Sequence, residues 1–197
     1  MDLPKRAGSI EVICGCMFAG KTEELLRRIR RIEYAKKDIV VFKPTIDDRY
    51  GTVNDVVSHN MSKAPCYPIK KSEDVYKVLG DKLPYAVAFD EAQFFGRDMI
   101  DCIEDLADKG VRVIVAGLDM DFRGEPFGIM ADLLCKAEEV TKLAAICQVC
   151  GAPATRTQRL INGKPAHYSE PIVVVGATEA YQARCRFCFS VPGKPTK

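Results

Sequence analysis

One segment near the start of the chain constrains the fold more than any other part of the sequence. Residues 15–22 are Gly-Cys-Met-Phe-Ala-Gly-Lys-Thr, which has the pattern Gly-x-x-x-x-Gly-Lys-Thr. A short apolar strand is predicted before it, over 8–14, and apolar residues three and four apart predict a helix after it, over 23–37. A strand, a glycine-rich turn and a helix in this order are typical of a phosphate-binding loop.

The chemistry of phosphate binding accounts for each part of this loop. Glycines allow successive backbone N–H groups to point at phosphate oxygens, and the helix N-terminus adds its positive end. We expect Lys21 to reach the β- and γ-phosphates of a nucleotide and the Thr22 hydroxyl to bind Mg²⁺. The simpler alternative is a glycine-rich start of a helix that binds nothing.

Two adjacent carboxylates, Asp90 and Glu91, follow the fully apolar stretch 85–89. An acidic residue at the carboxyl end of a strand beside a phosphate loop commonly holds Mg²⁺, a role we assign to Asp90. Glu91 can then take a proton from an attacking hydroxyl group or water. The alternative for Asp90 is a helix N-cap, where backbone N–H groups and the helix dipole favour a carboxylate.

Strands and helices alternate over the first three quarters of the chain, and the strands are apolar throughout. This pattern predicts an α/β domain, over 1–144, with a parallel sheet covered on both faces. The turn-rich stretch 45–68 is predicted to be a long loop with at most short strands. The remaining predicted elements are strands over 38–42, 85–89 and 111–116 and helices over 72–79 and 98–109.

The segment 145–197 differs in composition and contains two Cys-x-x-Cys pairs, Cys147/Cys150 and Cys185/Cys188. Four thiolates would hold one structural Zn²⁺ in a segment too small for a large core. The 34 residues between the pairs (151–184) exceed the usual spacing of about 15–20, which suggests that the loop itself has a use. Buried cysteines without a metal, or a redox pair, are the alternatives.

Other local patterns give smaller predictions. Asn162-Gly163 indicates a tight hairpin turn, and 171–175 could form a strand. The five remaining cysteines are interpreted as small hydrophobic residues, and His59 and His167 as structural or surface residues. Those five cysteines are Cys14, Cys16, Cys66, Cys102 and Cys135.

Composition excludes several classes of protein. Twenty-nine basic and 27 acidic side chains leave a net charge of +2, so no strong basic field favours nucleic acid as a partner. No apolar run approaches the roughly 20 residues of a membrane span, and the N-terminus lacks the apolar stretch of a signal peptide. Nine cysteines, an odd number, favour reduced thiols over a disulfide framework. We therefore expect a cytoplasmic protein with no membrane partner.

Taken together, these segments resemble the type II thymidine kinases, and the resemblance covers nearly the whole chain. It rests on the phosphate loop, the two cysteine pairs and the segments that flank them, and on three further motifs. These are FKPTIDDRY at 42–50, FDEAQFF at 89–95 and AGLDMDFRGEPFG at 116–128.

The resemblance implies a RecA-like phosphate-loop domain, a small zinc domain (145–197) with a lasso-type loop over the substrate, and a homotetramer. The implied reaction moves the γ-phosphate of ATP to the 5′-hydroxyl of thymidine, with Mg²⁺ as cofactor, deoxyuridine as a second acceptor and dTTP as a feedback ligand.

The resemblance also implies roles for individual residues. Glu91 is the catalytic base, and Arg49 supports the transferring phosphoryl group. Thymidine is expected to contact Met17, Leu118, Phe122, Phe127, Thr157, Ile172, Val173, Val174, Val175, Gly176 and Tyr181. The ATP–Mg²⁺ site is expected to contain Gly15, Cys16, Met17, Phe18, Ala19, Gly20, Lys21, Thr22, Asp90 and Gln93.

Two other functions fit parts of the sequence. Residues 90–93, Asp-Glu-Ala-Gln, resemble a helicase motif, so a nucleic-acid-stimulated ATPase is the main rival; such motors generally need two RecA-like lobes and a stacking platform. A non-catalytic zinc module would leave the phosphate loop unused.

Overall fold

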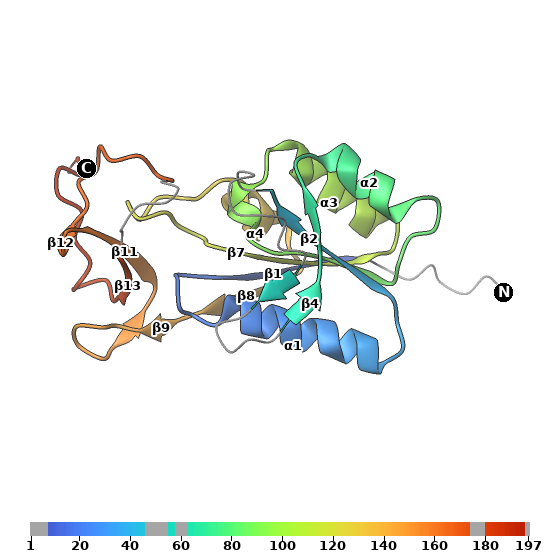
Figure 1. The fold of residues 1–197 in the computed structure, drawn as a ribbon, viewed down its shortest axis with the longest axis horizontal. Coiled ribbons are helices and arrows are strands. Elements are labelled where there is room, and N and C mark those ends of the chain that lie inside the picture. The colour runs from blue at the N-terminus through green and yellow to red at the C-terminus, as the bar shows by residue number, and fades with distance from the viewer. Residues whose placement is uncertain (1–7, 46–54, 58–62, 174–179, 196–197) are drawn as a thin grey trace.

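The computed structural model describes residues 8–45, 55–57, 63–173 and 180–195, and its core is a parallel sheet (Figure 1). The six strands lie in the order β5-β2-β6-β7-β1-β8, and every neighbouring pair is parallel. Their bounds are β1 Ser9–Gly15, β2 Ile39–Pro44, β5 Tyr67–Ile69, β6 Ala86–Phe89, β7 Arg112–Gly117 and β8 Glu139–Leu143.

Helices cover both faces of this sheet, as the apolar strands predict. Figure 1 shows α1 on one face and α2, α3 and α4 on the other. Alternate residues of β1 divide between the two layers: Ile13 packs in the cluster of α1, whereas Val12 and Cys14 pack in the cluster that includes α3. The helices are α1 Lys21–Tyr34, α2 Ser72–Leu79, α3 Asp98–Asp108 and α4 Met130–Lys136. The predicted α/β fold is confirmed.

The structure also adds elements that the sequence patterns did not predict. Where it is described, the stretch 45–68 contains only short strands, as predicted: β3 (Asp55–Val57) pairs with β4 (Lys63–Pro65). The strand β5, which begins at Tyr67 and extends the main sheet through β2, was not predicted. Neither α4 nor β8 was predicted; β8 is an edge strand with mostly exposed side chains, so its apolar signal is weak. Within the described ranges, no helix is long and apolar enough to cross a membrane.

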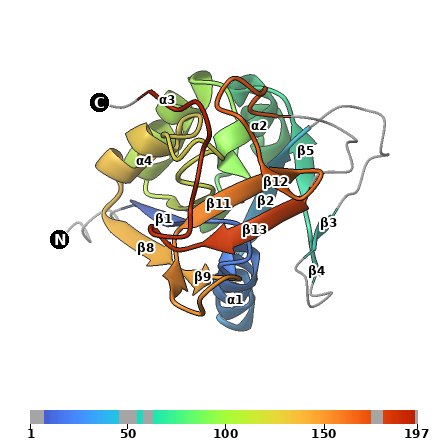
Figure 2. The ribbon, with the colours of Figure 1, turned by 90° about the vertical axis from the view of Figure 1, so that its left-hand side faces the viewer.

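The segment after β8 forms a second, smaller body (Figure 2). β8 ends at Leu143 in the main sheet, and β9 (Ala145–Ile146) pairs with β10 (Pro153–Ala154). A three-stranded sheet, β12-β11-β13, follows, with bounds β11 Arg156–Ile161, β12 Lys164–Pro165 and β13 Ala180–Arg184. The predicted hairpin turn at Asn162-Gly163 joins β11 to β12, and both residues have positive φ, 50° and 76°, as a tight turn of this kind requires.

The smaller body packs directly on the phosphate loop. Cys16 belongs to a buried cluster that also contains Cys147, Ala154 and Cys185, and Ala19 packs against it. The Cys16 thiol donates to the Ala154 carbonyl at 3.3 Å, and the Met17 N–H donates to Thr157 Oγ1 at 3.1 Å. The phosphate loop is therefore held by residues more than 130 positions away in the chain.

The parallel sheet fixes where the predicted acidic residues lie relative to this loop. All strand carboxyl ends meet at one edge of a parallel sheet, which is where such folds bind ligands. The loop follows β1, Asp90 follows β6, and β7 lies between these two strands. The sheet thus brings the phosphate loop and the acidic pair to one edge, with the end of β7 between them.

Candidate active site

The phosphate loop has the backbone that its glycines permit. Gly15 has φ +145°, and a Cβ atom there would lie 2.4 Å from the Leu143 carbonyl oxygen, so a larger residue would displace the loop. Helix α1 begins at Lys21, two residues earlier than predicted. The Lys21 ammonium donates to the Cys16 carbonyl at 2.9 Å, which places the charge across the mouth of the loop.

Asp90 is a buried carboxylate beside this loop. One of its oxygens accepts the Glu91 N–H at 2.9 Å. Burial and, to a smaller extent, the charge of Glu91 together raise the pKa of Asp90 to about 7, although Lys21 works in the opposite direction. Carboxylate and hydroxyl oxygens are ligands that Mg²⁺ accepts, and a bound cation would favour the charged form of Asp90. Asp90 and Thr22 therefore fit the expected metal.

Glu91 is held in a defined orientation by Gln93. Glu91 has φ 52°, a left-handed conformation that costs free energy and that non-glycine residues keep only where their surroundings fix it. Gln93 Nε2 donates to Glu91 Oε2 at 2.5 Å, while Gln93 Oε1 accepts the Leu118 N–H at 2.9 Å. Both ends of the buried Gln93 amide are thus engaged, and it lies behind Glu91 and outside the lining of the cleft.

A glycine permits this arrangement around Gln93. Gly128 has φ 53°, and a Cβ atom there would lie 2.1 Å from the Gln93 carbonyl oxygen. The chain after Phe127 can therefore pass close to η2 (Ala92–Phe94), the 3-10 turn that follows β6.

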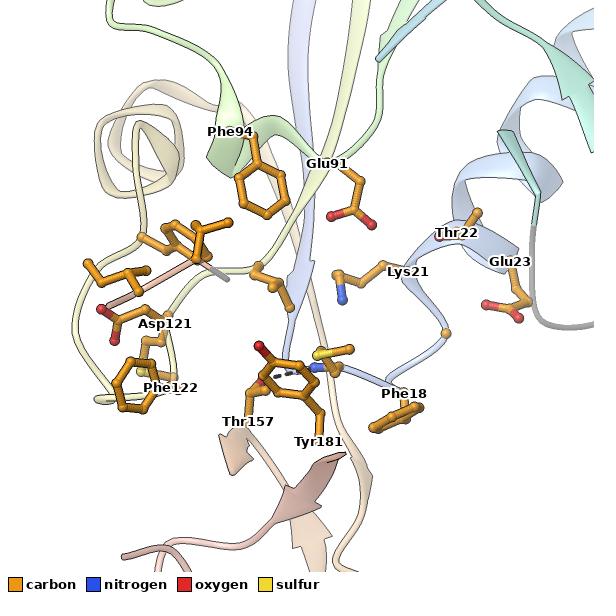
Figure 3. A pocket seen from close by; sticks show the side chains of 17 residues that line it. Phe18, Lys21, Thr22, Glu23, Glu91, Phe94, Asp121, Phe122, Thr157 and Tyr181 are labelled. Carbon is orange, nitrogen blue, oxygen red and sulfur yellow. Dashed lines mark hydrogen bonds between the residues drawn. The ribbon is translucent and has the colours of Figure 1, made fainter. Parts of the chain in front are cut away.

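The phosphate loop and an apolar pocket form one continuous cleft of about 700 Å³ (Figure 3). At one end lie Lys21, Thr22 and Glu91; at the other, aromatic and aliphatic side chains from the loop after β7 and from the small sheet. The volume is within the range of small-molecule sites, roughly 300–1,000 Å³. The expected thymidine contacts that line the cleft are Met17, Leu118, Phe122, Phe127, Thr157, Ile172, Val173 and Tyr181.

The cleft also contains residues that sequence reasoning did not place there. Phe94 packs edge to face on Phe127, with 5.4 Å between ring centroids, and lines the cleft. Glu23, Met120 and Asp121 line it as well. The one signal in the sequence that could have identified these three residues is their place in the chain: Glu23 follows the phosphate loop, and Met120 and Asp121 lie between Leu118 and Phe122.

Several expected residues are not brought to the cleft or cannot be described. Arg49, His59 and 174–176, which include Val174, Val175 and Gly176, lie outside the described residues. The described part of the possible strand 171–175, residues 171–173, is not in a strand. Of the five cysteines interpreted as small hydrophobic residues, Cys135 is exposed, on α4, and the other four are buried. His167 is an exposed residue whose ring packs close to Gly193.

The two cysteine pairs come together in the small body. Sγ atoms of Cys147, Cys150, Cys185 and Cys188 all lie within 4.8 Å of one another, and those of Cys150 and Cys185 are 3.6 Å apart. Sulfurs at about 2.3 Å from a tetrahedral Zn²⁺ would be about 3.8 Å apart, so this spacing suits the metal.

At the first cysteine of each pair, backbone N–H groups favour the thiolate. Burial raises the pKa of the Cys147 thiol, but backbone N–H groups, including those two and three residues further on, outweigh it and lower the pKa. In the second pair, the equivalent N–H groups, those of Cys188 and Phe187, lower the pKa of Cys185. Thiolates are the form that binds zinc, and the close spacing of the four sulfurs fits a structural zinc-binding domain.

The family model of thymidine kinases matches residues 8–189, which include all the strands described, the cleft and the four cysteines. The chain belongs to the thymidine kinase family. Membership implies a kinase, a phosphotransferase, and agrees with the resemblance found in the motifs.

Proposed function

We propose that the protein transfers the γ-phosphate of ATP to the 5′-hydroxyl of thymidine, giving dTMP and ADP. The observation that carries this proposal is the single cleft, in which a phosphate loop and an apolar, aromatic-walled pocket open into each other. Two substrates bound there would meet near Glu91, at the end of β6. Family membership supports the same reaction.

Glu91 is the proposed catalytic base. The 5′-oxygen attacks the γ-phosphorus, the bond from that phosphorus to the β–γ bridging oxygen breaks, and the hydroxyl proton passes to a Glu91 carboxylate oxygen. A carboxylate at the cleft wall can accept this proton only if it is held in a suitable direction. The hydrogen bond from Gln93 supplies that constraint, so we propose Gln93 as a positioning residue.

The phosphate loop, residues 15–22, would bind the phosphates of ATP. Lys21 would exchange its bond to the Cys16 carbonyl for the β- and γ-phosphates. Asp90 and Thr22 would hold Mg²⁺, which supplies positive charge beside the transferring group. We also propose that Arg49 supplies a second positive charge to the transferring phosphoryl group.

The apolar end of the cleft would bind the base and sugar. Phe94, Phe122 and Phe127 offer flat apolar surface for a pyrimidine, and the Tyr181 side chain points into the same space (Figure 3). A pocket of this kind would accept uracil as well, because a hydrophobic site gains only about 1–3 kcal/mol from one additional methyl group. We therefore include deoxyuridine as a second acceptor, and propose contacts from 174–176.

We further propose that 1–144 and 145–197 act as a kinase domain and a zinc domain. The change of sheet between Leu143 and Ala145 supports this boundary. A homotetramer, feedback binding of dTTP and a cytoplasmic location remain predictions from the family.

A phosphorylation screen of the four deoxynucleosides and deoxyuridine with ATP and Mg²⁺ tests the proposal. We expect dTMP and ADP in equal amounts with thymidine, and at most weak turnover with purine nucleosides. Single-stranded DNA should not stimulate ADP release. Stimulation by DNA without any phosphorylated nucleoside would instead favour the ATPase that the Asp-Glu-Ala-Gln segment suggests.

A further inference from the structure

Two arginines outside the proposed catalytic groups hold the chain just before it enters the cleft. Arg123 Nη2 donates to the Glu170 carbonyl at 2.8 Å, and Arg159 Nη1 donates to the Pro171 carbonyl at 2.5 Å. The next residues, Ile172 and Val173, line the cleft. Two successive peptide groups are thus held by side chains from different parts of the fold.

The same two guanidinium groups pack on aromatic rings of the cleft wall. Arg123 lies 5.5 Å and Arg159 lies 5.2 Å from the centroid of the Phe122 ring, and Arg123 is also 4.8 Å from the Tyr168 ring. These distances are within the range of cation–π attraction. Phe122 itself lines the cleft, so the wall ring and the held segment are joined through the two arginines.

Arg159 is only 1% exposed, and the burial of a charge is costly unless the charge is paired or hydrogen-bonded. It lies on β11 two residues after Thr157 and directly opposite Tyr181 on β13. Alternate and opposed residues share one face of a sheet, so all three side chains are on the face toward the cleft. Thr157 and Tyr181 line the cleft, and Arg159 lies behind this lining.

We propose that Arg123 and Arg159 are positioning residues that set the nucleoside wall of the cleft, by fixing the Glu170 and Pro171 carbonyls and thereby Ile172 and Val173. This inference rests on the proposed function, in which that wall contacts the nucleoside. Since the phosphate loop and Glu91 make none of these contacts, the arginines should affect nucleoside binding and leave ATP binding and the chemical step almost unchanged.

Steady-state kinetics of Arg123→Met and Arg159→Met test this. Methionine keeps much of the apolar length but has no N–H donor and no charge. We expect the KM for thymidine to rise about tenfold, the effect of losing one charged hydrogen bond, with kcat and the KM for ATP within about twofold. Arg123→Lys, which keeps a charge and a donor, should restore most of the affinity, and Arg97→Met, an exposed arginine paired with Asp132, should match the wild type.

Hydrogen exchange provides a readout that does not depend on activity. Amides in the peptide 164–173 should exchange at least about tenfold faster in both methionine variants, at unchanged zinc content and thermal midpoint. If the methionine variants show unchanged exchange, or an unchanged KM for thymidine while the wild type phosphorylates thymidine, the inference about the arginines is overturned and the proposed function stands. A wild-type protein that does not phosphorylate thymidine overturns the proposed function, and the exchange measurement still decides whether the arginines hold this segment.

Discussion

At the scale of single residues, the site depends on two neighbouring carboxylates with different surroundings. Asp90 is buried, and its pKa is raised to about 7 by burial and by Glu91. Glu91 lines the cleft and accepts a hydrogen bond from Gln93. The proposed roles, cation binding for Asp90 and proton acceptance for Glu91, fit these different environments.

Substitution Glu91→Gln tests the assignment of the base. Glutamine keeps the shape and one acceptor oxygen but cannot take the proton of the 5′-hydroxyl. Because positioned general bases typically contribute about 10²–10⁴-fold, kcat should fall by that factor. Isothermal titration should give nearly unchanged nucleotide affinity, and zinc content should be unaffected.

Asp90→Asn serves as the comparison for Glu91→Gln. Its activity should be partly recovered at raised Mg²⁺, because the loss is one of metal affinity. If Glu91→Gln lost ATP binding and kept its rate at saturation, the two carboxylates would have been assigned the wrong way round.

Gln93→Leu tests the positioning role. Leucine has similar volume but cannot donate to Glu91 or accept from the Leu118 N–H. Loss of such outer contacts commonly costs about 10–100-fold in activity, which we expect in kcat with both KM values within about twofold. A rise in the KM for ATP at constant kcat would mean that Gln93 belongs to the nucleotide site instead.

At the scale of secondary-structure elements, a buried ionic network joins α1 to the sheet. Arg28 on α1 donates to Glu11 on β1 at 2.5 Å, to Glu24 on α1 at 2.9 Å and to Thr141 on β8 at 2.7 Å. Arg112 on β7 donates to the other oxygen of Glu11 at 2.5 Å. Four elements therefore share one set of charged hydrogen bonds, which stabilises the helix that follows the phosphate loop.

This network makes stability depend on pH in a defined direction. Hydrogen bonds from Arg27 and Arg28 lower the pKa of Glu24 to about 2, from 4.5. Because the folded pKa is the lower one, the stabilisation is fully present above about pH 4.5 and is lost as pH falls toward 2. Urea unfolding should give a free energy of unfolding that falls between pH 6 and pH 3. This fall should be about 1 kcal/mol smaller in Glu24→Gln than in the wild type, a modest figure because solvent screens the exposed Arg27.

The matched control for this experiment is Glu33→Gln, an exposed position on the same helix. It should follow the wild type at both pH values. Equal pH dependence in Glu24→Gln and wild type would show that the network is not a source of stability.

At the scale of the whole molecule, the small body and the phosphate loop form one packed unit. Cys16 shares a buried cluster with Cys147 and Cys185, two of the four clustered cysteines, and Met17 bonds to Thr157 of β11. A change at the metal cluster can therefore reach the nucleotide end of the cleft through direct contacts.

Zinc removal should accordingly impair both substrates. We expect about one Zn²⁺ per chain by elemental analysis. Chelation, or Cys185→Ser, should lower the thermal midpoint and raise the KM values for ATP and thymidine together, because the loop and the wall lose the same support. Fully active protein with no metal would contradict this.

The sequence by itself determined the features that depend on neighbours in the chain. The helices over 72–79 and 98–109, the apolar strands, the turn at Asn162-Gly163 and the phosphate loop all follow from local periodicity, glycine and residue spacing. The two cysteine pairs were also visible, because metal ligands occur at short, regular spacings.

Only the tertiary structure decided which distant residues meet. The Cys16 thiol and its acceptor Ala154 are separated by 138 positions, and Gln93 contacts Leu118 only because β6 and β7 are adjacent in the sheet. Such contacts leave no periodic trace: Phe94 has the same local pattern whether it is core or cleft, and the short strand β5 gains its place from β2 rather than from its own three residues. Local patterns fix conformation, whereas packing between remote elements fixes the shape of the site.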